Sequence, residues 1–366
     1  MATHNDTIDP VAVHGLDLSY FTGKIEAYLR TIGLAYRLEE MTTGSFQALA
    51  QRTGVRQMPQ VELPDGTWLT DTPQIIDAME ARGGGLITPP DPACAFIAHA
   101  LEDYGDEWLW RPALYYRWAF KADAELMSRR LAEGMLRDIP GPLFARKHFI
   151  RLRQQWTYLR KDGVTPRTAP AIEALYRSTL QSLELILSQR PFLLGARPTR
   201  ADFGFFGGFF RHFFSDPTPA TIMRATAPAT MAWVARLWAL SPDDISDCAF
   251  PVGVPSDLAS IADAFSGRFL PYCLANEKAV AEGAVSVQWR DGEAAFTTPA
   301  NGYRVWRLHR LRGFWRALPD HARREVGGWL GERGARILDA DNLCEIARPV
   351  GGGVVDRTWR KAESPA

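Results

Sequence analysis

The sequence predicts an α/β domain at the amino terminus, then an all-α domain, then an additional, mainly helical extension. Three observations lead to this assignment. Strand-like and helix-like patterns alternate from Val11 to Glu80. A stretch rich in Gly and Pro follows at residues 82–92. From Ala93 onward, long apolar patterns at helical spacing replace the strand patterns. We therefore place the three parts at residues 10–82, 93–249 and 250–366.

The first part alternates between short strand and helix patterns. A strand is expected at Val11–His14, a helix after Ser19, and a second strand at Tyr36–Met41. A loop leads to the Xaa-Pro step, and the residues after it alternate like a strand. Asp65-Gly66 is a two-residue hairpin signal, and Thr67–Thr70 would return beside that strand. Asp71-Thr72-Pro73 then opens a helix, because proline is tolerated in a first helical turn.

Helical patterns dominate the remainder. In the second part we expect helices at Ala93–Lys121 (interrupted by Pro112), Ala122–Arg137, Pro142–Lys161, Ala169–Gln189, Arg200–Ser215 and Ala227–Ala239. In the extension we expect helices at Leu258–Phe265, Arg268–Ala281, Tyr303–Leu318 and Ala322–Leu330, and a hairpin around Asp291-Gly292. Met1–Asp9 is expected to be a frayed tail, and Gly351-Gly352-Gly353 a mobile segment.

Composition limits the class of protein. The chain has 366 residues, enough for two or three domains. Its 46% hydrophobic and 23% charged residues fit a soluble globular protein. The net charge of zero does not indicate a nucleic-acid or membrane partner, and no apolar run has transmembrane length. Met1–Pro10 lacks a signal-peptide core, so we expect a cytoplasmic protein.

The cysteines and histidines do not indicate a metal site. The four cysteines, Cys94, Cys248, Cys273 and Cys344, are widely scattered, and the seven histidines form no ligand motif with them. We expect the thiols to be reduced and mostly structural, with no metal cofactor.

The order of elements in the first part resembles the thioredoxin-like half of the glutathione transferase superfamily. Ser19-Tyr20-Phe21-Thr22 is similar to the S/C-P-Y/F-S/C segment of that family, although Tyr20 replaces its usual proline. Met58-Pro59 resembles the cis-proline step, and Asp71-Thr72 the acidic–hydroxyl pair. Thr199-Arg200-Ala201-Asp202 forms a capping-box pattern, which resembles the N-capping signature of the family's helical domain. The resemblance covers Val11–Glu80 and Ala93–Leu240 and weakens beyond; larger bacterial transferase-like proteins carry comparable extensions.

The resemblance implies glutathione as co-substrate and Ser19 as the catalytic hydroxyl, with Tyr20 and Thr22 as rivals. Lowering the thiol pKa by two units requires about 2.7 kcal/mol. A hydrogen bond to a charged acceptor contributes about 1.5–3 kcal/mol, and a helix N-terminus about 0.3–1 kcal/mol, so a hydroxyl at a helix start suffices. No cysteine occupies Ser19–Thr22, which argues against mixed-disulfide chemistry there.

The resemblance also implies how glutathione is held. The backbone of Met58, before a cis Pro59, would pair with the cysteinyl unit. Thr72, at a helix N-terminus, would bind the γ-glutamyl carboxylate, and Asp71 could face the ammonium group. Gln57 and Lys24 are weaker candidates for the glycyl end, because a lysine at such a position is more often simply solvated.

The second substrate is expected to be a small, hydrophobic electrophile. Candidate pocket residues are Tyr104, Trp108, Tyr115 and Tyr116, although aromatic residues at helical spacing usually belong to a core. Two functions remain open: a glutathione transferase with a role in detoxification (glutathione-dependent cleavage or isomerisation included), and a non-catalytic binding protein of the same fold. Relatives indicate a homodimer.

Overall fold

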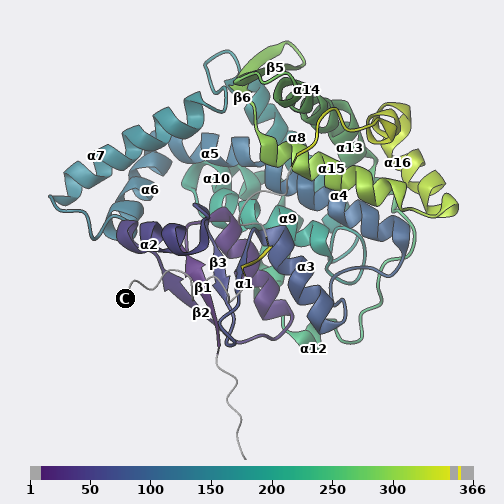
Figure 1. Ribbon diagram of the computed structural model, residues 1–366, viewed down its shortest axis with the longest axis horizontal. Coiled ribbons are helices and arrows are strands. Elements are labelled where there is room, and N and C mark those ends of the chain that lie inside the picture. The colour runs from purple at the N-terminus through teal and green to yellow at the C-terminus, as the bar shows by residue number, and fades with distance from the viewer. Residues whose placement is uncertain (1–9, 347–352, 356–366) are drawn as a thin grey trace, which may run out of the picture.

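The computed structural model describes residues 10–346 and the backbone of residues 353–355. Figure 1 shows a small sheet with its helices on one side of the molecule and a larger helical layer on the other. None of the described helices combines the length and the apolar character that crossing a membrane requires. The expected frayed tail at Met1–Asp9 lies outside the described residues, and so do Gly351 and Gly352 of the expected mobile segment.

The first part has the expected α/β architecture. Its strands are β1 (Val11–Gly15), β2 (Tyr36–Glu40), β3 (Gln60–Glu62) and β4 (Trp68–Thr70), and its helices α1 (Tyr20–Thr31), α2 (Thr43–Thr53) and α3 (Thr72–Gly83). The order is β2-β1-β3-β4, with β1 and β2 parallel and the other pairs antiparallel. The sequence-based fold class is confirmed: a thioredoxin-like domain precedes a helical one.

One element of the first part differs from expectation. The segment after Met41, expected to be a loop, forms α2. A capping box between Thr42 and Ser45 starts this helix, and Gly54, with a φ of 74°, ends it. Only Leu49 and Thr53 are buried on it, so the sequence carries no apolar stripe that would indicate a helix.

A fifth strand joins the sheet from the far end of the chain. The backbone of β7 (Gly353–Val355) pairs antiparallel with β4, with Leu69 opposite Val354. The carboxy-terminal segment thus covers the edge that β4 would otherwise expose.

The second part is helical throughout. It comprises α4 (Pro92–Trp108), α5 (Trp110–Ala119), α6 (Lys121–Glu133), α7 (Leu143–Gln154), α8 (Ala169–Leu187), α9 (Arg200–Gly208), α10 (Pro217–Thr226), α11 (Pro228–Ala239) and α12 (Pro242–Ile245). Two π-helical segments, η1 (Gln155–Arg160) and η2 (Phe209–Phe214), continue α7 and α9. The expected break occurs at Leu109, because Pro112 fits the first turn of α5. The capping box of Thr199 and Asp202 is present.

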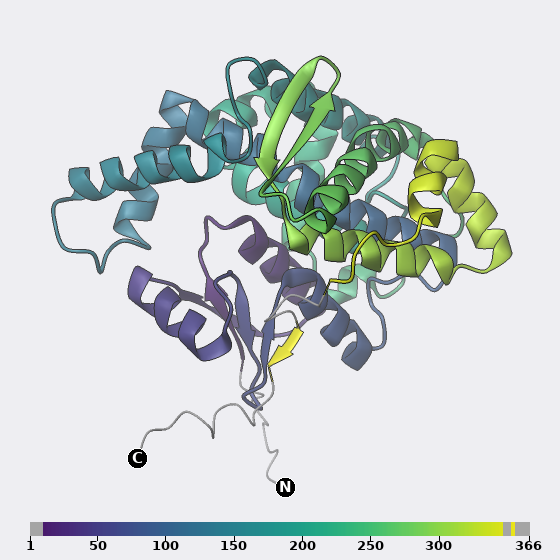
Figure 2. The ribbon, with the colours of Figure 1, turned by 45° about the horizontal axis from the view of Figure 1, so that its top comes forward.

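The extension packs onto the helical domain and reaches the first domain. It contains η3 (Ser256–Leu258), α13 (Ala259–Ala264), η4 (Phe265–Phe269), α14 (Leu270–Ala281), the hairpin β5 (Ser286–Asp291) and β6 (Ala294–Pro299), α15 (Gly302–Arg316) and α16 (Asp320–Asp339). Gly331, with a φ of 65°, interrupts α16. Figure 2 shows α15 running along α4 above α3. One main hydrophobic cluster contains residues from all three parts, so the division into three stays a prediction.

Helices α4 and α9 lie at the centre of the molecule, and their backbones approach each other very closely. A Cβ added to Gly105 would lie 2.5 Å from the backbone of Gly204, and one added to Gly204 would lie 2.5 Å from Glu102 Cα. The two glycines therefore let the helix backbones touch. This contact fixes α4, which carries two acidic residues of the cleft described below, Asp106 and Glu107.

Candidate functional site

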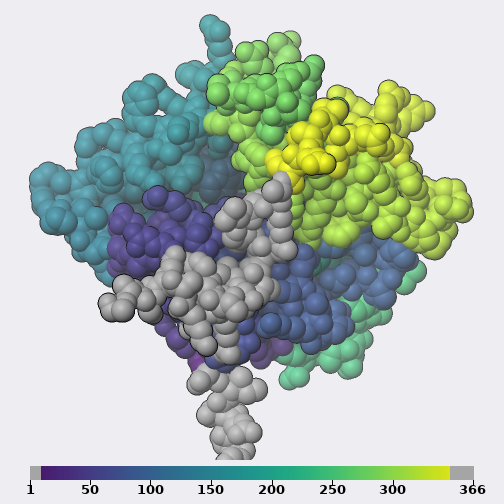
Figure 3. Space-filling model, in the orientation of Figure 1, coloured from purple at the N-terminus to yellow at the C-terminus, as the bar shows by residue number. Residues whose placement is uncertain are grey.

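A cleft of about 460 Å³ lies where the first domain, helices α5 to α7 and the extension meet. Figure 3 shows a hollow at this junction. One end of the cleft is apolar and is formed by residues that include Leu16, Phe46, Leu114, Trp118, Leu131 and Met135. The other end is polar and is formed by residues that include Asp71, Thr72, Asp106, Glu107, Tyr303 and Arg307. The starts of α1 and α3 lie along its floor.

Ser19 lies in the cleft at the start of α1. It is the N-cap of this helix, in extended conformation, and its Oγ accepts a hydrogen bond from the Thr22 amide at 3.4 Å. The side chain is half-buried and lines the cleft. Accepting this bond uses an oxygen lone pair, which leaves the hydroxyl proton for a ligand.

The two rival hydroxyl groups face elsewhere. Tyr20 is 1% exposed, and its hydroxyl donates to the Gly105 carbonyl in α4. Burial raises its pKa well above the usual value. Its ring packs on Gly207 and Gly208. Thr22 is fully buried, and its Oγ1 accepts from the Leu16 amide at 3.4 Å. The structure therefore does not present either hydroxyl to the cleft as Ser19 is presented.

The proline step lies beside Ser19. The Met58-Pro59 peptide bond is cis, as the sequence predicted. Both residues line the cleft, and so do the preceding Arg56 and Gln57, whose side chains are exposed. Arg56 was not among the sequence-based candidates, although its position three residues before Pro59 could have indicated it.

Asp71 and Thr72 lie where β4 turns into α3. Asp71 has a φ of 66°, which is uncommon outside glycine. Its carboxylate does not cap the helix: Oδ1 accepts from the Tyr303 hydroxyl at 2.7 Å, and Oδ2 accepts from Gln74. The amides of Gln74 and Ile75 bond to the Asp71 carbonyl, and Pro73 has no amide proton. The Thr72 amide is therefore the first-turn donor that these bonds leave to a ligand.

Lys24 is a correction to the sequence analysis. It was a candidate for the glycyl end of glutathione, but its side chain is fully buried and does not line the cleft. Its Nζ lies 2.8 Å from Glu102 Oε1 and 2.7 Å from Asp106 Oδ2, on α4. Lysine is almost never fully buried unless paired. Its role is to join α1 to α4 through a buried ion pair.

Asp106 is an acidic group of the cleft that the sequence did not single out. It is 1% exposed and lines the polar end. Its Oδ2 pairs with Lys24, whereas the buried Oδ1 has no hydrogen-bond partner within the described residues. Burial raises the pKa of Asp106 to about 7. An unsatisfied buried oxygen is costly, and the residue that carries it borders the cleft.

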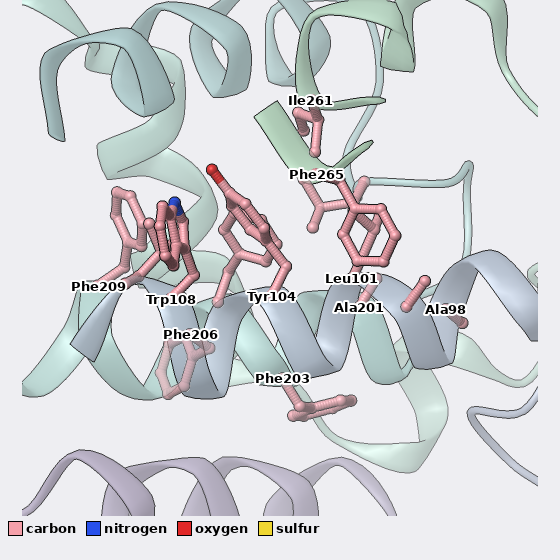
Figure 4. Packing of buried hydrophobic residues seen from close by; sticks show 14 of the residues in the cluster. Ala98, Leu101, Tyr104, Trp108, Ala201, Phe203, Phe206, Phe209, Ile261 and Phe265 are labelled. Atoms are coloured by element: carbon pink, nitrogen blue, oxygen red, sulfur yellow. The ribbon is translucent and has the colours of Figure 1, made fainter. Parts of the chain in front are cut away.

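The four aromatic residues expected to bind the second substrate are also corrected. Tyr104, Trp108, Tyr115 and Tyr116 are 2%, 0%, 7% and 0% exposed, and none lines the cleft. Figure 4 shows Tyr104 and Trp108 packed among Phe206, Phe209 and Phe265. The Tyr115 hydroxyl donates to Glu173 at 2.7 Å. All four residues belong to the hydrophobic core, which was the alternative to a pocket role.

Other aromatic residues line the cleft instead. Phe21 and Trp110 stack with ring centroids 5.9 Å apart, and Tyr158 of η1 meets Trp110 edge-on at 6.1 Å. All three line the cleft. Trp110 follows the helix break at Leu109, which turns α5 and brings its first turn toward the first domain. The sequence showed the break but not this orientation.

The extension contributes residues that sequence reasoning missed. Asn301, Tyr303, Arg304 and Arg307 line the polar end. Arg307 Nη1 donates to the Tyr303 oxygen at 3.0 Å, and its Nε donates to Asp103 at 2.8 Å. Arg304 Nε donates to Glu107 at 2.9 Å. The spacing of Tyr303 and Arg307, four residues apart on a helix, places them on one face.

The remaining reactive groups do not suggest a metal centre. All four cysteines are free. Burial raises the pKa of Cys94 to about 12 and raises that of Cys273 further. Among the described residues, no group of His, Cys, Asp or Glu is arranged to hold a metal ion.

Comparisons with known proteins agree with the fold of the first domain. Residues 13–85 match the family model described as glutathione S-transferase, N-terminal domain. No match was found among curated proteins. Among solved structures, a tau class glutathione S-transferase from mango is 18% identical, with a TM-score of 0.40, covering 65% of this chain and 93% of its own. A glutathione S-transferase from Rhodospirillum rubrum F11 is 17% identical (TM-score 0.42; 67% and 96% covered). A β-etherase from Sphingobium sp. strain SYK-6 is 17% identical (TM-score 0.44; 65% and 99% covered).

Proposed function

The chain belongs to the glutathione S-transferase superfamily through its amino-terminal domain, and from this premise we propose that it binds glutathione and activates its thiol. The activated thiol would attack a hydrophobic electrophile. One observation carries the proposal: the starts of α1 and α3 face one cleft, with the Ser19 hydroxyl at the first and Thr72 at the second.

Ser19 is proposed to hold the glutathione thiolate. A free thiol has a pKa of about 8.5 and is largely protonated at neutral pH. A hydroxyl donor aimed at sulfur contributes about 1.5–3 kcal/mol when the acceptor is charged, and the start of α1 adds about 0.3–1 kcal/mol. The sum lowers the thiol pKa by one to two units or more, because one unit corresponds to about 1.4 kcal/mol.

The rest of glutathione is assigned to the polar end of the cleft. The Thr72 amide and hydroxyl would take the γ-glutamyl carboxylate, and the backbone of Met58 the cysteinyl unit. Asp71 is occupied by Tyr303 and Gln74, so the ammonium group is assigned to the unpaired Oδ1 of Asp106. Arg56, exposed at the mouth, replaces Lys24 as the cation for the glycyl carboxylate, beside Gln57.

The second substrate is assigned to the apolar end. Phe46, Trp110, Leu114 and Trp118 would surround a hydrophobic electrophile next to Ser19. No cysteine lies among the described residues that line the cleft, which supports conjugation rather than a mixed disulfide with the protein. We also propose that the protein is cytoplasmic, acts in detoxification and forms a homodimer.

A non-catalytic binding protein is the second candidate. The observation in its favour is that Tyr20, in place of the usual proline, is tied to the Gly105 carbonyl of α4. The catalytic segment is thereby held against the helical domain, which would restrict any adjustment around a reacting sulfur. Such a protein would bind glutathione without ionising it.

The two functions differ in whether the thiol of bound glutathione is ionised. We expect the wild-type protein to be retained on glutathione resin, to show ultraviolet thiolate absorbance when glutathione binds at neutral pH, and to conjugate chlorodinitrobenzene. Binding without thiolate absorbance or turnover would support the non-catalytic function. No retention and no calorimetric heat with glutathione would exclude both.

A further inference from the structure

The hairpin formed by α6 and α7 carries most of the large hydrophobic side chains that the described residues expose. Six of eleven such side chains lie on it, in its loop or in η1, which continues α7: Leu126, Ile139, Phe144, Phe149, Leu152 and Trp156. Figures 1 and 2 both show this hairpin projecting from the side of the molecule. We call these six side chains the hairpin patch. Scattered exposed apolar residues are ordinary, but a concentration of this kind marks an interaction surface.

Helix α7 turns its apolar side outward. Phe144 is 74% exposed, Phe149 56%, Leu152 42% and Trp156, in η1, 57%. Phe149, Leu152 and Trp156 recur at the spacing of one helix face, and Phe144 lies in the first turn of α7. The opposite side is occupied by Ile150, which is 2% exposed, and by Gln154, which lines the cleft. The patch is thus a convex ridge without a covering element in the described part of the chain.

The charged side chains of the same segment are all basic. Residues 139–161 contain six Lys and Arg and no Asp or Glu: Arg146, Lys147, Arg151, Arg153, Arg160 and Lys161. Lys147 pairs with Glu125 of α6. The other five make no ion pair with any described residue. Arg160 lies over the Trp156 ring, 3.7 Å from its centroid, so a cation and the apolar ridge are in direct contact.

These features together favour an anionic, flat and apolar partner. A helix with Phe, Leu and Trp outward and flanking Lys and Arg suits the interface of a membrane with negatively charged lipids. A second copy of the chain fits less well, because pairing of two such ridges would bring ten unpaired cations together. A convex ridge also cannot act as a groove for a peptide.

We propose that the hairpin patch docks the protein on membranes that contain anionic phospholipids. The patch would enter the headgroup region with the cations beside it, without any membrane-crossing helix. The cleft borders the same segment, because Arg153, Gln154 and Tyr158 line it. If the proposed function also holds, apolar substrates dissolved in the lipid would lie next to the cleft; membrane binding itself does not depend on that function.

The experiment is co-sedimentation of the full-length protein with phospholipid vesicles. We expect binding to vesicles of equal parts phosphatidylcholine and phosphatidylglycerol, weak binding to phosphatidylcholine alone, and a steep loss with added salt. Each cation near such a surface contributes about 1 kcal/mol to binding. R151Q/R160Q removes two cations and should therefore lower the partition coefficient roughly 30-fold. Phe149→Glu/Leu152→Glu should abolish binding. None of these four residues lines the cleft.

Two control variants match these changes elsewhere on the surface. Leu185→Glu alters a side chain that is 68% exposed on α8, and Arg324→Gln alters an exposed arginine on α16; both should bind like wild type. Trp156→Phe should remove a fluorescence blue shift seen on binding, which locates the contact. Equal binding by hairpin and control variants overturns the proposal. So does absence of vesicle binding together with a dimer, seen by light scattering, that Phe149→Glu/Leu152→Glu dissociates.

Discussion

Ser19 can combine two roles, because one oxygen can cap a helix and still donate its proton. Its Oγ accepts from the Thr22 amide, and the hydroxyl proton remains free for the proposed bond to the glutathione sulfur. Loss of the cap alone costs about 1 kcal/mol of stability. A test of catalysis therefore has to separate stability from thiol ionisation.

We expect Ser19→Ala to raise the pKa of bound glutathione by about one to two units, because the donor is lost while the helix start remains. Affinity should change little, and kcat/KM at neutral pH should fall roughly 10- to 100-fold. The deficit should shrink as pH rises, since alkali ionises the thiol unaided. Ser188→Ala, which removes an exposed hydroxyl at the C-cap of α8, is the control. A thiolate signal that survives in Ser19→Ala but disappears in Thr22→Ala would transfer the role to Thr22.

Asp106 predicts a pH dependence of binding. Burial raises its pKa to about 7, so below that pH the free protein carries a neutral acid that cannot pair with an ammonium group. The affinity for S-methylglutathione, which has no thiol to titrate, should fall as pH drops below about 7, by at most about tenfold per unit. Calorimetry of the wild type across pH 7 tests this. A flat profile would remove Asp106 from the ammonium site, whether or not Asp106→Asn folds.

At the level of the elements, short-range signals predicted well. The hairpin at Asp65-Gly66, the helix after Asp71 and the capping box at Thr199 depend on residues adjacent in the chain, and each is present. Helix α2 buries only two side chains and gave no such signal. The apolar pattern also could not distinguish a core aromatic from a pocket aromatic, because both occupy the inner face of a helix. Tyr104 and Trp110 show the difference: only the second follows a helix break.

The contact of α4 with α9 gives a prediction at this scale. Gly204→Ala would place a methyl group 2.5 Å from Glu102 Cα, and overpacking of this kind costs about 1–3 kcal/mol. The melting temperature should therefore fall by several degrees. Gly313→Ala in α15 is the matched control, because a Cβ there meets nothing within 4 Å, and replacing an exposed helix glycine stabilises by about 0.5–1 kcal/mol. Equal melting temperatures for the two variants would contradict the close contact.

At the level of the whole molecule, the extension is part of the site. Tyr303 connects it to the first domain by donating to Asp71 and accepting from Arg307. The partners Tyr303 and Asp71 are 232 positions apart in the chain, so no local pattern could reveal their contact. The same holds for Lys24, whose exposure was misjudged because its counter-ions lie on α4.

We expect Tyr303→Phe to weaken glutathione binding by up to about tenfold, because it removes a hydrogen bond worth about 1.5 kcal/mol that holds Asp71 at the start of α3. The change should raise KM and leave kcat nearly unchanged, since Tyr303 acts through the start of α3, where Thr72 is proposed to bind the γ-glutamyl carboxylate, and does not touch the sulfur. Tyr36→Phe, which loses a 3.3 Å bond to Glu26 away from the cleft, provides the comparison. A fall in kcat with constant KM would point to a different role for Tyr303.

Net charge describes the whole chain and not its parts. A sum of zero over 366 residues conceals a stretch of 23 residues, 139–161, without a single acid. Balanced composition therefore does not exclude an anionic partner; the distribution along the chain decides.

The buried ion pairs of Lys24 set an order of events during synthesis. A ribosome releases α1 long before α4, and the counter-ions Glu102 and Asp106 follow Lys24 by 78 and 82 positions. Arg307, which also contacts Asp106, comes 201 positions after it. The nascent first domain can begin to fold early, but its ammonium group stays in water until α4 emerges. The polar end of the cleft is complete only when translation has passed α15, so a fragment released before that point lacks part of its binding surface.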